Sequence, residues 1–147
     1  MKVVLQRVAR ASVSVDGNVT GSIDKGYVAL LGIRQGDDKT KVEKMVEKIQ
    51  KLRLFPDENG KTNLSIEDVK GGILVISQFT LCADCRKGTR PSFDNAASPV
   101  IAEELYQYFV ECCIKTKCFS KTGQGVFGAK MQVELVNDGP FTVIVEL

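Results

Sequence analysis

The chain has 147 residues, of which 44% are hydrophobic and 26% charged, which is the profile of one globular domain. Its formal net charge of +2 is too small to indicate general nucleic-acid binding, although a local basic patch fits within it. The chain contains no histidine, which excludes Ser-His-Asp and Cys-His catalysis and every zinc site built on imidazole.

The first third of the chain has the pattern of strands. Apolar and polar residues alternate over residues 3–15, Asp16-Gly17 supplies a tight hairpin turn, and residues 19–23 form the predicted returning strand. A mostly apolar strand follows over residues 27–33.

An amphipathic helix is predicted next, because apolar residues recur at spacings of three and four: Val42, Met45, Val46, Ile49 and Leu52. Thr40 is the expected N-cap, with Glu43 completing a capping box. The helix should end before Phe55-Pro56, since proline disfavours helical geometry in the residue before it. A solvated turn over residues 57–60 and one helical turn over residues 65–68 should follow.

A predicted buried strand over residues 73–76 is followed directly by polar residues. Gly71-Gly72 opens four aliphatic residues, 73–76, which indicate a strand buried on both faces. Ser77, Gln78 and Thr80 then bring hydrogen-bonding side chains where a core strand should stay apolar. They fit either a strand leaving the core or a polar pocket that holds a carbonyl oxygen or an oxyanion.

Residues 82–97 have no periodicity and predict a long loop, a length that is often functional. Arg86, Lys87 and Arg90 on this loop fit either a solvated surface or a phosphate-binding track. A second helix begins at Ser98-Pro99, with its expected apolar face made of Ile101, Leu105, Tyr108, Phe109 and Cys112.

The C-terminal part combines a glycine-containing loop, residues 115–128 with Phe127, and two predicted strands, 131–135 and 141–147. Gly139-Pro140 between these strands fits an ordinary hairpin turn or a constrained proline, cis in one interpretation, that fixes the direction of the Gly139 carbonyl. The sum, about seven strands and two main helices, predicts a single α+β domain over residues 1–147 with a mostly antiparallel, barrel-like sheet.

The cysteines do not form a disulfide framework, because they are five in number and include the adjacent pair Cys112-Cys113. Cys82 and Cys85 fit a redox motif or half of a zinc site, but the second ligand pair lacks the regular spacing, so we assign no metal. Because there is no long apolar run and no signal-peptide core, we expect a cytoplasmic protein.

Several motifs in order resemble the D-aminoacyl-tRNA deacylase family. They are the opening residues 1–8, Ser77-Gln78-Phe79-Thr80-Leu81, residues 87–93, Gly125-Val126-Phe127-Gly128-Ala129, and Asn137-Asp138-Gly139-Pro140-Phe141-Thr142. The likeness covers essentially the whole chain. Two features depart from the family pattern: Phe141 replaces a small aliphatic residue, and Cys82 and Cys85 stand where many members have other residues.

The resemblance implies a homodimer, without cofactor, that hydrolyses the ester between a D-amino acid, or glycine, and the 3′-terminal adenosine of tRNA. It implies a site at the dimer interface in which each pocket is completed by the partner, with Ser77, Gln78, Phe79 and Thr80 facing Gly139 and Pro140. Phe127 is the further substrate-binding residue, and Arg86, Lys87 and Arg90 are assigned to tRNA.

The implied chemistry suits a chain without histidine. An aminoacyl ester is already activated, so orienting it, positioning water and stabilising the oxyanion suffice, the last through the N–H groups of Phe79 and Thr80. A non-catalytic RNA-binding module, with Phe79 or Phe127 for stacking, is the rival hypothesis from another class. A cysteine-based redox or zinc protein is the second rival.

Overall fold

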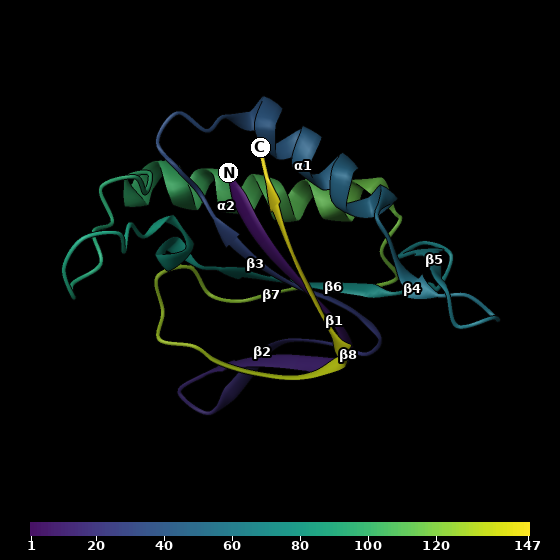
Figure 1. Cartoon of the computed structure of the whole chain (residues 1–147). Helices are drawn as coiled ribbons and strands as arrows, with labels where there is room; N and C mark the ends of the chain where they lie inside the picture. The colour runs from purple at the N-terminus through teal and green to yellow at the C-terminus, as the bar shows by residue number, and fades with distance from the viewer.

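The computed structural model describes all residues, 1–147, as a sheet nearly closed into a barrel with two helices across one side (Figure 1). The helices are α1 (Lys39–Lys51) and α2 (Pro99–Thr116). The strands are β1 (Lys2–Val15), β2 (Asn18–Ile23), β3 (Gly26–Gly32), β4 (Arg53–Pro56), β5 (Thr62–Ser65), β6 (Gly72–Ser77), β7 (Thr122–Gln124) and β8 (Gln132–Glu146). The predicted α+β, barrel-like fold with two main helices is confirmed. Neither helix is long and apolar enough to cross a membrane.

The main sheet is mixed. Its order is β2-β1-β3-β6-β7, and β8 pairs with the opposite edge of β1. Strand β1 is antiparallel to β2, β3 and β8, whereas β6 is parallel to both β3 and β7. The ends of the sheet approach each other so closely that a Cβ on Gly21 would lie 2.6 Å from the Gln124 carbonyl oxygen, so glycine is required for this near closure.

Two hydrophobic cores result. The larger one lies between the sheet and the helices and includes Val3 and Leu5, whereas the smaller one fills the barrel and includes Val8, Ala11 and Val13. Strand β1 serves both cores. Val8 faces the smaller core by ordinary alternation from Val3 and Leu5, and the register shift between Val8 and Arg10 then places Ala11 and Val13 on the same side as Val8.

The predicted strand break at Gly139-Pro140 is wrong. Strand β8 pairs with β1 before and after this segment, from Ser14 opposite Gln132 to Lys2 opposite Glu146. Gln6 pairs with Thr142 and Val8 with Asn137, so residues 138–141 bulge out of the ladder opposite Arg7 alone. Gly139 has φ of +143° and the Gly139-Pro140 peptide bond is cis. The turn residues therefore form a bulge within one long strand.

Local signals misplaced several smaller features. The N-cap of α1 is Asp38, which accepts a hydrogen bond from the Lys41 N–H at 2.8 Å, so Thr40 lies inside the helix. Residues 53–65 form the β4–β5 hairpin, which was not predicted. The helical turn predicted over residues 65–68 directly follows it, with the Val69 N–H donating to the Ser65 carbonyl at 3.4 Å. The three-residue strand β7 lies within the predicted glycine loop. In α2, Ile101 is exposed and Tyr106 is buried, so the buried face of the helix is rotated relative to the predicted one.

A buried carboxylate, Asp37, organises the segment between β3 and α1. It accepts hydrogen bonds from the Met1 ammonium at 2.8 Å, the Arg34 N–H at 2.7 Å and Lys41 Nζ at 3.1 Å. Burial raises the pKa of Asp37, but the hydrogen bonds from the amine, from Arg34 and from Lys41 outweigh it and hold this pKa below its usual value.

Replacing Asp37 with asparagine should lower the free energy of unfolding by about 3 kcal/mol at neutral pH, because two cationic groups lose their anion. Because its pKa is lowered in the folded state, Asp37 stabilises the fold above the unfolded pKa of about 3.9 and ceases to do so as pH falls through the folded value. Urea unfolding between pH 7 and pH 3 should therefore show a smaller acid-induced loss for Asp37→Asn than for wild type. Parallel pH profiles would contradict this role.

Candidate active site

A cavity of about 490 Å³ opens where β6 ends. Ser77, Gln78 and Phe79 line it from β6 and the turn that follows, and Phe127 lines it from the loop after β7. Most of its remaining wall is apolar and comes from β3, α2 and the start of β8. The cavity falls in the size range of small-molecule sites, about 300–1,000 Å³, with few polar groups placed at one end.

Pairing with β3 holds the polar end of β6 in place. Ser77 is the last residue in register with β3, opposite Leu31, and the Gln78 N–H donates to the Leu31 carbonyl at 2.8 Å. The chain then tightens into the 3₁₀ helix η1 (Phe79–Cys82). The N–H groups of Phe79 and Thr80 stand at its start, where a helix offers no internal acceptor, so they are free to bind an anion.

Thr80 is exposed and does not line the cavity, but it is linked to a residue that does. The Gln78 amide donates a short hydrogen bond to the Thr80 hydroxyl. Ser77 and Gln78 are half-buried, and the Phe79 side chain is 57% exposed. Ser77 and Gln78 therefore give the cavity a polar, accessible mouth, with Thr80 beside it.

Tyr106 of α2 supports the wall of this cavity, and it is not among the site residues that the sequence predicted. Its hydroxyl lies 2.9 Å from the Val75 carbonyl oxygen and 3.2 Å from that of Gly125, and its ring packs 5.8 Å from that of Phe127. Burial raises the pKa of Tyr106 to about 12, so it stays a neutral donor. Its place in the helical pattern of Ala102, Leu105 and Phe109 was the available signal.

Gly139 and Pro140 do not line the cavity of their own chain. They are exposed on the bulge of β8. The Arg7 side chain contacts the residues on either side of them, Asp138 and Phe141. The Arg7 guanidinium donates to the Asp138 carbonyl at 2.9 Å and to the Leu54 carbonyl at 2.7 Å, and it lies 4.7 Å from the centre of the Phe141 ring. A charged residue inside an alternating strand was the only sequence signal for this role.

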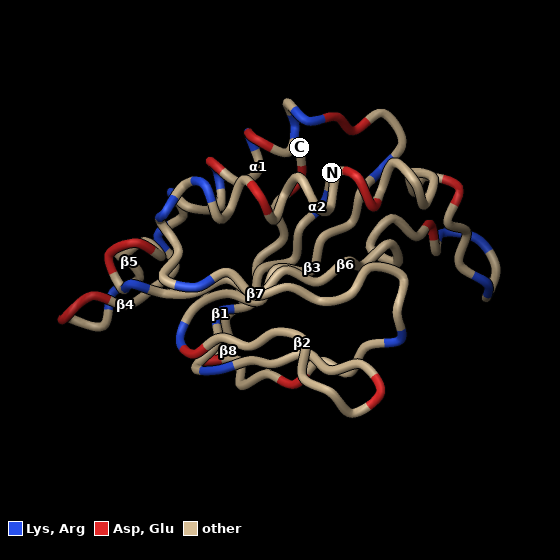
Figure 2. The backbone as a smooth tube through the Cα atoms, turned by 180° about the vertical axis from the view of Figure 1, so that it is seen from behind, with Lys and Arg blue, Asp and Glu red and all other residues tan.

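The predicted basic residues lie on the exposed loop after η1. Arg86 forms a bidentate pair with Asp84, and these hydrogen bonds lower the pKa of Asp84 to about 2. Lys87 and Arg90 form no salt bridge. Figure 2 shows basic segments at the tip of this loop, which projects from the body of the molecule. This loop thus carries two cations without an ion-pair partner.

All five cysteines are free. Burial raises the pKa of the Cys82 thiol, which donates to the Ile33 carbonyl at 3.4 Å, whereas Cys85 is exposed on the loop. No cluster of three or more cysteine, aspartate or glutamate side chains is arranged to hold a metal ion.

Known proteins resemble the chain over nearly its full length. The family model described as D-Tyr-tRNA(Tyr) deacylase matches residues 4–146. A D-aminoacyl-tRNA deacylase of Koribacter versatilis is 53% identical over 99% of this chain and 97% of its own, and that of Shewanella amazonensis is 52% identical over 97% of each. A solved structure described as c-Myc DNA Unwinding Element Binding Protein is 44% identical, with a TM-score of 0.94 over 100% of this chain and 99% of that one.

A more distant solved structure, described as a probable eukaryotic D-amino acid tRNA deacylase, shares only the fold, with 15% identity and a TM-score of 0.86. Taken with the cavity at the end of β6, these relatives place the chain in the class of ester hydrolases that act on aminoacyl-tRNA. The chain belongs to the D-aminoacyl-tRNA deacylase family.

Proposed function

We propose that the chain hydrolyses the ester between a D-amino acid and the 3′-terminal adenosine of tRNA, that it spares L-aminoacyl-tRNA, and that it thereby proofreads chirality in the cytoplasm. The observation that carries the proposal is the cavity in which Ser77, Gln78 and Phe79 meet Phe127, in a chain that matches the family over residues 4–146. Its apolar wall suits adenine and its polar mouth suits the ester.

The proposed reaction needs no side-chain nucleophile. The N–H groups of Phe79 and Thr80 bind the oxyanion that forms as water attacks the ester carbonyl. The bond between the acyl carbon and the ribose oxygen then breaks, and the proton that the water loses passes to that oxygen, so the products are the free amino acid and the tRNA hydroxyl. Ser77 and Gln78 orient the substrate, and the Thr80 hydroxyl, held by the Gln78 amide, positions rather than attacks. The reaction therefore proceeds without histidine.

Selection of the D-enantiomer is assigned to Gly139 and Pro140 of a second copy of the chain. The Gly139 carbonyl faces the substrate's α-amino group, and Pro140 occupies the space that an L side chain would enter. Two features support a shared site: Gly139 and Pro140 are exposed and absent from their own cavity, and the outward face of β8 carries exposed apolar side chains, among them Ile144 at 62%. In the homodimer each cavity is completed by its partner.

Release of tyrosine from matched D- and L-tyrosyl-tRNA tests this proposal. We expect D-tyrosine to be released and L-tyrosine to stay attached, because only the L side chain meets Pro140. Glycyl-tRNA should also be cleaved, since glycine presents no side chain to exclude. Equal release from both enantiomers would contradict the selection mechanism.

Thr80→Ala should keep most of its turnover, with a loss of no more than about tenfold, because it removes one positioning hydrogen bond. Single-turnover release of D-tyrosine measures the effect, and Thr80→Ser, which keeps the hydroxyl, is the matched control. If Thr80→Ala abolished turnover while substrate binding and the fold survived, the hydroxyl would be a nucleophile and our assignment would be wrong.

A second candidate function is nucleic-acid binding without catalysis. It is favoured by the relative described as a c-Myc DNA Unwinding Element Binding Protein and by the unpaired Lys87 and Arg90 on the exposed loop. Tight binding of tRNA or duplex DNA without release of D-tyrosine would support this function in place of the hydrolase.

A further inference from the structure

A second cavity, of about 680 Å³, lies on the opposite side of η1 from the proposed active site. Leu81 and Cys82 of η1 line it, together with Arg34, Gln35, Arg86 and Asn95. Two chain segments line both cavities. Ile33, Ala96 and Ala97 line the first cavity, whereas Arg34, Gln35 and Asn95 line the second. The Gln35 N–H joins these segments by donating to the Asn95 carbonyl at 3.0 Å. The proposed reaction uses none of this surface.

The second cavity carries hydrogen-bond donors that the fold leaves free. The cations Lys2, Arg34 and Arg86 line it. Lys2 and Arg34 share one carboxylate, Glu146, at 3.0 and 3.2 Å, and Arg86 pairs with Asp84, so three cations face two carboxylates. The Arg34 guanidinium makes one hydrogen bond, from Nη2 to Glu146 at 3.2 Å, so most of its N–H groups have no acceptor. The Asn95 side-chain amide makes none. These donors suit an anion with several oxygens, such as a phosphodiester.

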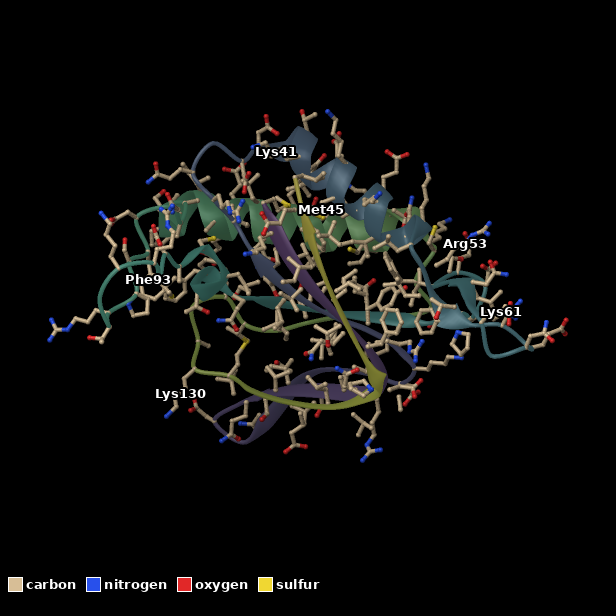
Figure 3. The ribbon with its side chains drawn as sticks, in the orientation of Figure 1. Lys41, Met45, Arg53, Lys61, Phe93 and Lys130 are labelled. Carbon is tan, nitrogen blue, oxygen red and sulfur yellow. The ribbon has the colours of Figure 1, made fainter.

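An aromatic ridge joins the two cavities. Phe79 lines the first cavity, and its ring meets that of Phe93 edge to face at a centroid distance of 5.0 Å. Phe93 lies on the loop after η1 (Figure 3), directly after Ser92, whose backbone pairs with Asp84 of the second cavity. Both rings are open to solvent, with 57% and 37% of Phe79 and Phe93 exposed. Exposed aromatic rings beside cations are the usual platform for an unpaired nucleobase.

We propose that the second cavity binds the nucleotide that precedes the terminal adenosine of the tRNA acceptor strand. Its base stacks on the ridge of Phe79 and Phe93, and its phosphate accepts hydrogen bonds from Arg34 and Asn95. The inference rests on the proposed function, because it requires the terminal adenosine to occupy the first cavity. A nucleotide, rather than an acidic peptide, is the ligand that uses both the ring pair and the cations.

The binding of two probes, the trinucleotide CCA and adenosine, tests the proposal by titration calorimetry of the intact protein. Wild type should bind CCA about tenfold more tightly than adenosine, because CCA adds one charge-assisted contact and one stacked base. Arg34→Gln and Asn95→Ala should each remove most of this advantage while leaving the affinity for adenosine unchanged. For Arg34→Gln, the slope of log Kd against log salt should also fall by about 0.7, the value for one phosphate of a single strand.

Glu146→Gln is the matched control. It breaks the ion pair with Arg34, and also the one with Lys2, but leaves both cations in place, so its affinity for CCA should be kept or increased. Equal weakening by both variants would show that the ion pair acts on the fold, and it would overturn the proposal. Equal affinity of wild type for CCA and adenosine would overturn it as well.

The binding measurement does not depend on turnover, so the two proposals fail separately. If the protein binds CCA more tightly than adenosine in an Arg34-dependent manner but releases no D-tyrosine, the nucleotide site is supported and the proposed function is wrong. If the protein releases D-tyrosine but binds CCA no more tightly than adenosine, the proposed function is supported and the nucleotide site is wrong.

Discussion

Gly32→Ala should lower kcat for D-tyrosyl-tRNA by about ten- to a hundredfold while the protein stays folded. A Cβ on Gly32 would lie 2.9 Å from Leu81 Cβ, 3.1 Å from the Gln78 carbonyl oxygen and 3.3 Å from Cys82 Sγ. The start of η1 must therefore move to restore ordinary contacts of at least 3.4 Å. Displacing groups that bind the reacting carbonyl by about 1 Å can cost a hundredfold in rate.

Gly71→Ala separates this effect from a general loss of stability. It also creates crowding, with a Cβ 2.5 Å from Ile66 Cδ1, but at the opposite end of β6 from the proposed site. Single-turnover kinetics and thermal unfolding should be measured for both variants. Gly71→Ala should lose stability and keep its kcat, and an equal fall in kcat for both variants would rule out a specific role for the position of η1.

Arg7→Gln should lower the ratio of D- to L-tyrosyl-tRNA turnover by about a hundredfold. The Arg7 side chain is 10% exposed and holds the β8 bulge through the Asp138 carbonyl and the Phe141 ring. Loss of the hydrogen bond to the Asp138 carbonyl, about 1.5 kcal/mol, and of the cation–π contact with Phe141, about 1 kcal/mol, frees the segment that carries Gly139 and Pro140. In the proposed mechanism Pro140 excludes the L side chain by its fixed position, and a mobile Pro140 would lose this effect.

Arg53→Gln makes the same change of charge at an exposed site, where the arginine contacts only the Asn63 side chain. Its D- to L- ratio should match that of wild type. Rates on both substrates should be compared with circular dichroism as a check on folding. If a folded Arg7→Gln kept full discrimination, the bulge would not depend on Arg7 for its position.

The sequence predicted those parts of the fold that depend on local pattern. Alternation defined β1 and the turn at Asp16-Gly17, and the proline after Ser98 marked the start of α2. Three short strands, β4, β5 and β7, were missed because three or four residues are too few to show a period. The N-cap of α1 was wrongly predicted as Thr40 because Asp38, two residues earlier, is also a good N-cap residue.

The candidate site was predictable only in part. Ser77, Gln78 and Thr80 stood out because polar residues ended a buried strand, and the structure places the first two in a cavity. The contribution of Tyr106 depends on packing between α2 and β6, which no local pattern encodes. The role of Arg7 depends on long-range pairing between β1 and β8, with residues 138–141 bulging opposite it. Turn chemistry alone therefore suggested a hairpin at Gly139-Pro140.

A crystal structure with a non-hydrolysable D-tyrosyl-adenosine analogue tests the shared active site most directly. We predict that the adenine lies against Phe127, that the carbonyl oxygen lies within hydrogen-bond distance of the Phe79 and Thr80 N–H groups, and that the α-amino group faces Gly139 of a second copy. An analogue bound outside this cavity, or a cavity without Gly139 of a second copy, would contradict the account.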